Sequence, residues 1–213
     1  MKIFSLNPIG LLAALGFAAI IVYFTGSMAV PFILLLLTFL VAGAIVTRYG
    51  YDRKRELTIY EYERSWENVL ANGLVPTVCA IAYAYNPAAL WAYIGSVAAI
   101  LSDKFASEIG VLGGQPYALP RLNRVKFGTS GAVSLLGTLA SWDGGMIIGI
   151  AAYFLFPGLT LWDALIISCI GAAGSFADTL AGVLEERGIG NKATTNFICS
   201  VVGAVLGYVL LAH

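Results

Sequence analysis

Seven long apolar segments follow one another along the chain, separated by short polar or turn-forming stretches. They are Pro8–Phe24, Met28–Thr47, Asn68–Tyr85, Pro87–Ile109, Thr129–Phe156, Thr160–Leu184 and Lys192–Leu211. A helix needs about 20 residues, with a range of about 17–25, to cross the hydrocarbon core of a bilayer. Three joints, Thr25-Gly26-Ser27, Asn86-Pro87 and Pro157-Gly158, are typical turn sequences. The pattern predicts an all-α bundle of about seven transmembrane helices.

The composition agrees with a single transmembrane domain over residues 1–213. Of the 213 residues, 59% are hydrophobic and 11% are charged, whereas a soluble domain carries about 25% charged residues. The first segment is interpreted as a retained span, because no small-residue cleavage pattern follows it. Cys79, Cys169 and Cys199 lack metal-ligand spacing, so we expect them to be structural. We expect no nucleic-acid partner, and the sequence leaves the oligomeric state open.

The basic residues fix the orientation that we expect. With seven spans, eleven of the twelve fall on one side of the membrane, and Lys104 lies near the same end of its span. The eleven are Lys2, Arg48, Arg53, Lys54, Arg55, Arg64, Arg121, Arg124, Lys126, Arg187 and Lys192. By the positive-inside rule, the N-terminus and the connections Arg48–Glu67, Gly110–Gly128 and Glu185–Asn191 are cytoplasmic. We therefore expect an integral, multi-pass membrane protein, in the cell membrane if the source is a prokaryote.

The segment Ser102–Gly110 closes an apolar run and contains two acids, a lysine and two hydroxyl groups. Charged side chains are costly in hydrocarbon and usually face a bundle interior or a water-filled site. On a helix Asp103 shares a face with Ser107, and Lys104 shares one with Glu108, because residues four apart are neighbours. A local ion pair explains Lys104 and Glu108. Asp103 has no such local partner, and this makes it the first candidate for a function.

A similar stripe of small and polar residues occurs in the sixth segment. There the motif Asp178-x-x-Ala181-Gly182 matches Asp103-x-x-Ala106-Ser107 of the fourth segment. Because both segments run from outside to inside, the match indicates a parallel internal repeat of segments four–five and six–seven. Close helix–helix contact is the simpler explanation of the stripes. It accounts for the glycines but not for the aspartates.

Polar residues also gather where the third, fifth and seventh segments begin, on the predicted cytoplasmic side. They are Asn68 and Asn72; Gly128–Gly131 with Ser134; and Gly190, Asn191, Thr194, Thr195 and Asn196. Helix N-termini bind anions through free N–H groups and the macrodipole. We therefore expect phosphate binding, with Thr129 and Ser130 at the N-terminus of the fifth helix, although no Walker loop is present. Simple N-capping by Asn191 and Thr129 is the alternative, and it explains one residue per helix.

Carboxylates and helix N-termini thus gather at one leaflet, as a site for a metal-bound polyphosphate requires. Mg²⁺ is typically held by one or two carboxylates plus substrate phosphates, and Asp103 and Asp178 are the candidate ligands. Arg121, Arg124 and Lys126 are candidates for phosphate contacts, although the positive-inside rule explains each of them alone.

Two other charged features lie outside this candidate site. We assign the cluster Arg53–Arg55 to anionic lipid headgroups. Asp143 is interpreted as a further buried acid at mid-span. It lies too deep for the site, and we assign it no role.

The motifs at these positions resemble a family of multi-spanning membrane proteins that includes the plant chloroplast phytyl-phosphate kinase and many microbial members. The matching motifs are Arg64–Gly73, Ser102–Gly110, Gly128–Thr138, Gly174–Thr179 and Gly190–Asn196. The resemblance covers residues 64 to 213. Lys104 and Lys192 depart from the family pattern, which has Thr at the first position and Asn or Asp at the second.

The resemblance implies a prenyl (isoprenoid) monophosphate kinase acting at the cytoplasmic face with Mg²⁺. It would transfer the γ-phosphate of a nucleoside triphosphate, with CTP favoured, to a prenyl phosphate lipid and give the prenyl diphosphate. Nucleotidyl transfer from CTP to a lipid phosphate needs the same parts and stays open. Transport of a small solute or ion also stays open, because intramembrane acids and repeats occur in transporters. The gathering of polar residues at one leaflet argues against transport.

Within this interpretation Asp103 and Asp178 hold Mg²⁺, and Glu108 is a third catalytic candidate. The residues expected to bind nucleotide and phosphate are Asn68, Asn72, Lys104, Ser107, Arg121, Arg124, Lys126, Thr129, Ser130, Ser134, Ser175, Thr179, Asn191 and Asn196. The prenyl tail is expected to leave into the lipid along the small residues of the fourth and sixth segments.

Overall fold

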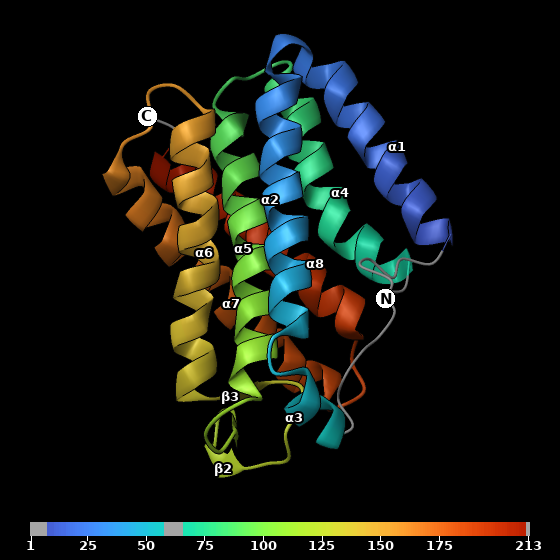
Figure 1. The fold of residues 1–213 in the computed structure, drawn as a ribbon, viewed down its shortest axis with the longest axis vertical. Helices are drawn as coiled ribbons and strands as arrows, with labels where there is room; N and C mark the ends of the chain where they lie inside the picture. Colours follow the sequence, from blue (N-terminus) through green and yellow to red (C-terminus); the bar gives the residue numbers. More distant parts are fainter. Residues whose placement is uncertain (1–7, 58–65, 212–213) are drawn as a thin grey trace.

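The computed structural model describes residues 8–57 and 66–211, and seven long helices make up most of it (Figure 1). They are α1 (Pro8–Thr25), α2 (Ala29–Arg48), α4 (Trp66–Tyr83), α5 (Ala89–Gly110), α6 (Leu135–Leu155), α7 (Leu161–Glu185) and α8 (Lys192–Leu211). The predicted all-α bundle is confirmed. Helix ends lie within two residues of the predicted spans, except at the start of α6.

Four stretches of the described chain are long and apolar enough to cross a membrane: Pro8–Arg48, which contains both α1 and α2, and the helices α6, α7 and α8. Helices α4 and α5 are also long, but α4 has a polar first turn and α5 carries three charged residues. The burial of α5 explains its composition, because charged groups that face protein need not be solvated by lipid.

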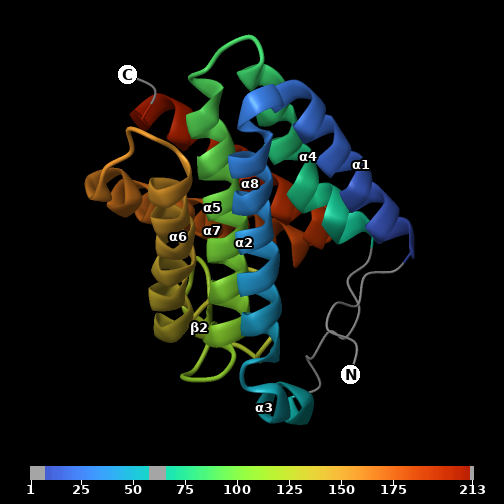
Figure 2. The same cartoon turned by 45° about the horizontal axis from the view of Figure 1, so that its top comes forward.

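Helix α5 forms the centre of the bundle, and α2, α4, α6, α7 and α8 all pack against it. Figures 1 and 2 show α5 between α2 and α6, with α1 and α4 together on the outside. An unbroken run from Tyr93 to Ser102 is buried. The hydroxyl of Tyr93 donates a hydrogen bond to the carbonyl oxygen of Phe32 in α2, at 2.6 Å. The position of α5 brings its charged last turns next to α3 (Tyr51–Glu56), α6, α7 and α8.

The predicted stripes of small residues are contacts between helices. Gly95 of α5 faces Gly203 and Gly207 of α8, and Gly174 of α7 faces Ala99 of α5, so a Cβ atom at either glycine would clash. Small residues allow this close approach of backbones in lipid. The stripes are already in contact and leave no room for a chain. The expectation that they line the exit of a prenyl tail is therefore wrong.

The connection between α5 and α6 folds into a small antiparallel sheet with the order β2-β1-β3. Its strands are β1 (Tyr117–Ala118), β2 (Asn123–Arg124) and β3 (Ala132–Val133). The short helices η1 (Gly26–Met28) and α3 (Tyr51–Glu56) complete the described elements. Figure 1 shows α3 and the sheet at the same end of the bundle, where the predicted cytoplasmic connections lie.

The prediction that the fifth span begins at Thr129 is wrong. Gly128 and Gly131 adopt positive φ angles of 85° and 72°, which a right-handed helix does not contain. Ala132 then pairs with Ala118 in the sheet. Helix α6 begins only after Ser134, whose side chain accepts a hydrogen bond from the Gly137 N–H and caps the helix.

Candidate functional site

Asp103 and Asp178 lie side by side where α5, α7 and α8 meet. Asp103 is in the last two turns of α5 and interacts electrostatically with Asp178, which is in the last two turns of α7. Asp178 is buried, with 6% of its surface exposed, and Asp103 is half-buried. The structure thus places the two predicted metal ligands next to each other on parallel helices.

Lys192, the first residue of α8, is the third charged member of this cluster. Its Nζ lies 2.9 Å from Asp178 Oδ2, and it also interacts with Asp103. Its side chain is 49% exposed, against 8% for Asp178. Lys104 is near Asp103 as well, but it is bound to Glu108. Lys192 therefore faces two adjacent carboxyl groups, and the ammonium group of Lys104 near Asp103 is shared with Glu108, an arrangement that can accept a further cation.

Asp178 and Asn196 each carry a buried oxygen atom without a hydrogen-bond partner among the described residues. Within the described chain Asp178 Oδ1, Asn196 Oδ1, Ser200 Oγ and Ser102 Oγ are buried and have no hydrogen-bond partner. A buried acceptor without a partner costs about 1–3 kcal/mol. Asn196 follows Lys192 by one turn on the same face of α8. One turn further along α8, Cys199 packs against Gly174 of α7, which is one turn from Asp178. Asn196 therefore lies on the side of α8 that faces Asp178. Asp178 and Asn196 thus supply the type of oxygen that binds Mg²⁺ in a region with unmet bonding capacity.

Glu108, the third predicted catalytic acid, is held by two lysines. Lys54 Nζ lies 2.7 Å from Glu108 Oε2, and Lys104 Nζ contacts Glu108 Oε1. Lys54 also donates hydrogen bonds to the carbonyl oxygens of Val46 and Thr47, at 3.0 and 3.1 Å. Lys54 therefore joins α3 and the end of α2 to α5 through Glu108 Oε2, whereas Lys104 occupies Oε1 within α5 itself. The local Lys104–Glu108 pair is confirmed, and the assignment of Lys54 to lipid headgroups is wrong, because its side chain is 2% exposed.

The Gly128–Gly131 loop is docked on the end of α7. Ser130 donates hydrogen bonds from its backbone N–H to Glu186, at 2.9 Å, and from its hydroxyl to Glu185, at 2.6 Å. The Thr129 hydroxyl donates to the Lys126 carbonyl oxygen. Because two acids occupy the donors of Ser130, this loop is not arranged as a phosphate cradle. The expectation that Thr129 and Ser130 lie at a helix N-terminus is wrong.

Three of the other predicted contact residues make local hydrogen bonds. Asn191 caps α8, because its Oδ1 accepts from the Thr194 N–H at 3.0 Å, so the N-capping alternative is confirmed there. The Ser107 hydroxyl donates to the Lys104 carbonyl oxygen, and that of Thr179 donates to the carbonyl oxygen of Ser175. Asn68 and Asn72 of α4 are half-buried. Arg121, Arg124 and Lys126, in the β1–β3 region, are exposed.

Asp143 lies on the outer face of α6 and is exposed. The buried side of α6 is formed by Gly137, Gly144, Gly145 and other small residues that pack against α5 and α7. The interpretation of Asp143 as a buried acid is therefore wrong. The exposure of Asp143 depends on how α6 is rotated about its axis. That rotation is set by the face of α6 that α5 and α7 contact.

The sequence interpretation missed Lys192 as a member of the carboxylate cluster and Lys54 as a partner of Glu108. Lys192 was marked by its departure from the family pattern, which was a usable signal, because a lysine in place of Asn or Asp changes the charge of the site. Lys54 gave no comparable signal. It is separated from Glu108 by 54 positions and sits in a basic run.

The chain belongs to the integral membrane protein family DUF92, whose family model matches residues 1–207. It is 39% identical over 195 residues to "Uncharacterized membrane protein MJ0933" of Methanocaldococcus jannaschii, covering 90% of this chain and 79% of that protein. It is 35% identical over 165 residues to "Uncharacterized membrane protein sll0875" of Synechocystis, covering 72% of this chain and 63% of that protein. It is also 28% identical over 221 residues to "Protein PGR" of Arabidopsis thaliana, covering 90% and 74%. No solved structure is similar to it. The family predicted from the motifs and the multi-pass membrane location are thus confirmed.

Proposed function

We propose that this DUF92 membrane protein is a prenyl (isoprenoid) monophosphate kinase that uses a nucleoside triphosphate, with CTP favoured, at the end of the bundle that holds Asp103 and Asp178. One observation carries the proposal: two carboxylates from parallel helices lie together beside Lys192, and Asp178 Oδ1 is buried without a hydrogen-bond partner among the described residues. This arrangement suits a cation that arrives with its phosphate ligands. The motif resemblance supplies the reaction class.

The residues fit Mg²⁺ bound to a triphosphate. Among the described residues no group of three or more His, Cys, Asp or Glu is arranged around a common metal position. A magnesium ion that comes with a nucleotide needs only one or two protein carboxylates, since phosphates and water fill its other positions. Asp103 and Asp178 would hold the ion, and the Asn196 side chain would reach the ion or its water. The ion would neutralise charge on the triphosphate.

Lys192 would then contact phosphate. Its side chain is 49% exposed, so it can turn from Asp178 toward the end of α8 without crossing the packed core. An ammonium group and the N–H groups at a helix N-terminus both stabilise phosphate oxygens. Lys192 would neutralise Asp178 in the empty site and bind anionic substrate in the filled one.

The proposed reaction is an in-line displacement. An oxygen of the prenyl phosphate attacks the γ-phosphorus, the bond from that phosphorus to the β–γ bridging oxygen breaks, and nucleoside diphosphate leaves with the bond electrons. The acceptor phosphate is already a nucleophile, so the protein mainly positions the two substrates and neutralises their charge. The carboxylates that would hold Mg²⁺ lie on one side of Lys192, and the N-terminus of α8 lies on the other. This arrangement suits a reaction that brings together two anionic substrates, the triphosphate and the prenyl phosphate.

The test uses purified protein in detergent with Mg²⁺, CTP or ATP, and a panel of prenyl monophosphates. Label from the γ-phosphate is expected in the prenyl diphosphate. Transfer of label from the α-phosphate instead would identify a cytidylyltransferase. Absence of transfer from both CTP and ATP to every prenyl phosphate would refute both reactions on prenyl phosphates.

A further inference from the structure

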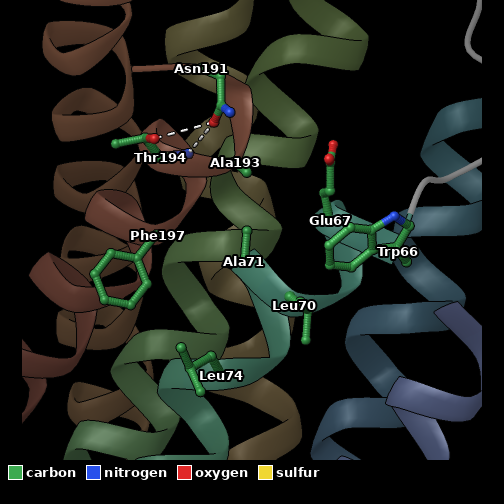
Figure 3. Close-up of a pocket in the computed structure, with 9 residues that line it drawn as sticks. All are labelled: Trp66, Glu67, Leu70, Ala71, Leu74, Asn191, Ala193, Thr194 and Phe197. Atoms are coloured by element: carbon green, nitrogen blue, oxygen red, sulfur yellow. Dashed lines mark hydrogen bonds between the residues drawn. The ribbon is translucent and has the colours of Figure 1, made fainter. Parts of the chain in front are cut away.

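A shallow groove between α4 and α8 is open on the outer surface of the bundle and has a volume of about 430 Å³. Its polar end is formed by Glu67, Asn191 and Thr194, and its apolar part includes Leu70, Leu74 and Phe197 (Figure 3). Figure 3 shows Glu67 and Asn191 toward one end of the groove and Leu74 and Phe197 toward the other.

The polarity of the groove changes along its length. Leu70, Leu74 and Phe197 are 38%, 44% and 39% exposed in a part of the bundle that faces lipid. The polar residues lie in the first turn of α4 and around the start of α8, at the predicted cytoplasmic interface. A molecule that matches both parts has an apolar chain that extends into the bilayer and a polar head at the interface. Such a molecule is a lipid, because a soluble ligand would leave the apolar part unmatched.

The polar end of the groove is continuous with the carboxylate cluster. Asn191 lines the groove, and the next residue, Lys192, binds Asp178. Ala193, Thr194 and Phe197 face the groove, whereas Lys192 and the buried Asn196 belong to the side of α8 that packs toward α7. Only the first turn of α8 therefore separates the groove from the carboxylates. A head group at the end of α8 is within reach of both.

We propose that the α4–α8 groove holds the isoprenoid chain of a prenyl monophosphate, with the phosphate turned toward Asn191 and Lys192. This rests on the proposed function and names the place of its lipid substrate. Glycine contacts close the seam between α5 and α7, so the chain takes the α4–α8 side of the site. The carboxylate of Glu67 lies at the polar end, and the Lys192 ammonium offsets its repulsion of the phosphate.

Photo-crosslinking tests the location without requiring turnover. The probe is a long-chain prenyl monophosphate with a diazirine at the far end of its chain, added to the full-length protein in vesicles. Labelled peptides are expected to contain residues 70–74 or 193–197. An excess of unlabelled prenyl monophosphate should suppress the labelling, whereas an excess of phosphatidylcholine should not. Labelling on other helices, or equal competition by phosphatidylcholine, would overturn the assignment.

Kinetics provide a second readout with a matched control. Leu74→Trp fills the groove, and Leu165→Trp changes an equally exposed leucine (44% for each) on α7. Changing the fit of one methylene-sized group in an apolar pocket alters discrimination by about 10–200-fold. We expect Leu74→Trp to raise KM for a long prenyl phosphate by at least ~10-fold, with little change for dimethylallyl phosphate. Equal behaviour of the two variants would refute the groove.

The outcomes separate the two proposals. If wild-type protein transfers no phosphate to any acceptor, the kinase proposal fails, and the crosslinking map still decides what the groove holds. If turnover occurs but crosslinks lie elsewhere, only the groove fails. Should Leu74→Trp not fold, Leu70→Trp and its control Leu136→Trp, both at residues 38% exposed, replace that pair.

Discussion

Replacing Asp178 by asparagine should separate catalysis from stability. The substitution keeps the shape of the side chain but removes a charge that faces Lys192, at 2.9 Å, and the proposed Mg²⁺ position. Loss of one strong electrostatic contact at a reacting centre costs about 10²–10³-fold in kcat, or about 2.7–4 kcal/mol. We expect a fall in turnover of at least ~10²-fold.

Stability should change much less. The Lys192 side chain is half exposed, so its ammonium group reaches water once Asp178 is neutral. Lys192 also keeps Asp103 as a counter-charge, so the loss should stay near that of exposed ion pairs, about 0–1 kcal/mol. We therefore expect the free energy of unfolding of Asp178→Asn to stay within about 1 kcal/mol of wild type. A large loss of turnover with a small loss of stability is the signature of a ligand site.

The assay pairs Mg²⁺-dependent phosphate transfer with thermal unfolding in the same detergent. Asp103→Asn should behave like Asp178→Asn, because both residues belong to the cluster. Asp143→Asn is the matched control: it makes the same chemical change on the outer face of α6 and should leave turnover unaltered. Well-folded Asp178→Asn and Asp103→Asn proteins with full Mg²⁺-dependent turnover would refute the two-aspartate metal site.

Three further predictions concern the fold around the site. Glu108→Gln should lower stability by about 3–5 kcal/mol, seen as earlier thermal unfolding, because it leaves the buried Lys54 without its counter-charge; an unchanged transition would show that the pair is not structural. Ser134→Ala should cost about 1 kcal/mol by loss of the α6 cap, with turnover unchanged; loss of turnover in stable protein would instead indicate a phosphate contact. Single cysteines, introduced into a protein without Cys79, Cys169 and Cys199, should report the topology. We expect labelling from outside at Ser27, Asn86 and Gly158 and from the cytoplasm at Arg55, Asn123 and Gly188, and a reversal at any position would contradict the predicted topology.

The sequence by itself determined the features that depend on local chemistry or on the bilayer. The lengths of the apolar segments predicted the seven helices, because the thickness of the hydrocarbon core sets the length of a span. The Lys104–Glu108 pair and the Asn191 cap follow from contacts within one or two turns. The motifs identified the family. Each of these features is formed by residues that are close in the chain, or can be identified from a single segment of the sequence.

Only the tertiary structure decided which side of each helix faces protein. In lipid the outer surface of a bundle is as apolar as its core, so hydrophobic periodicity does not reveal the buried face. Asp143 therefore passed for a buried residue although it faces outward.

The same limit hid partners that are far apart in sequence. Lys54 reaches Glu108 across 54 positions, and Ser130 reaches Glu185 across 55. The α4–α8 groove likewise exists only because two helices from opposite halves of the chain lie together. These contacts arise when helices pack, and packing depends on the shapes of whole faces, which no single segment contains.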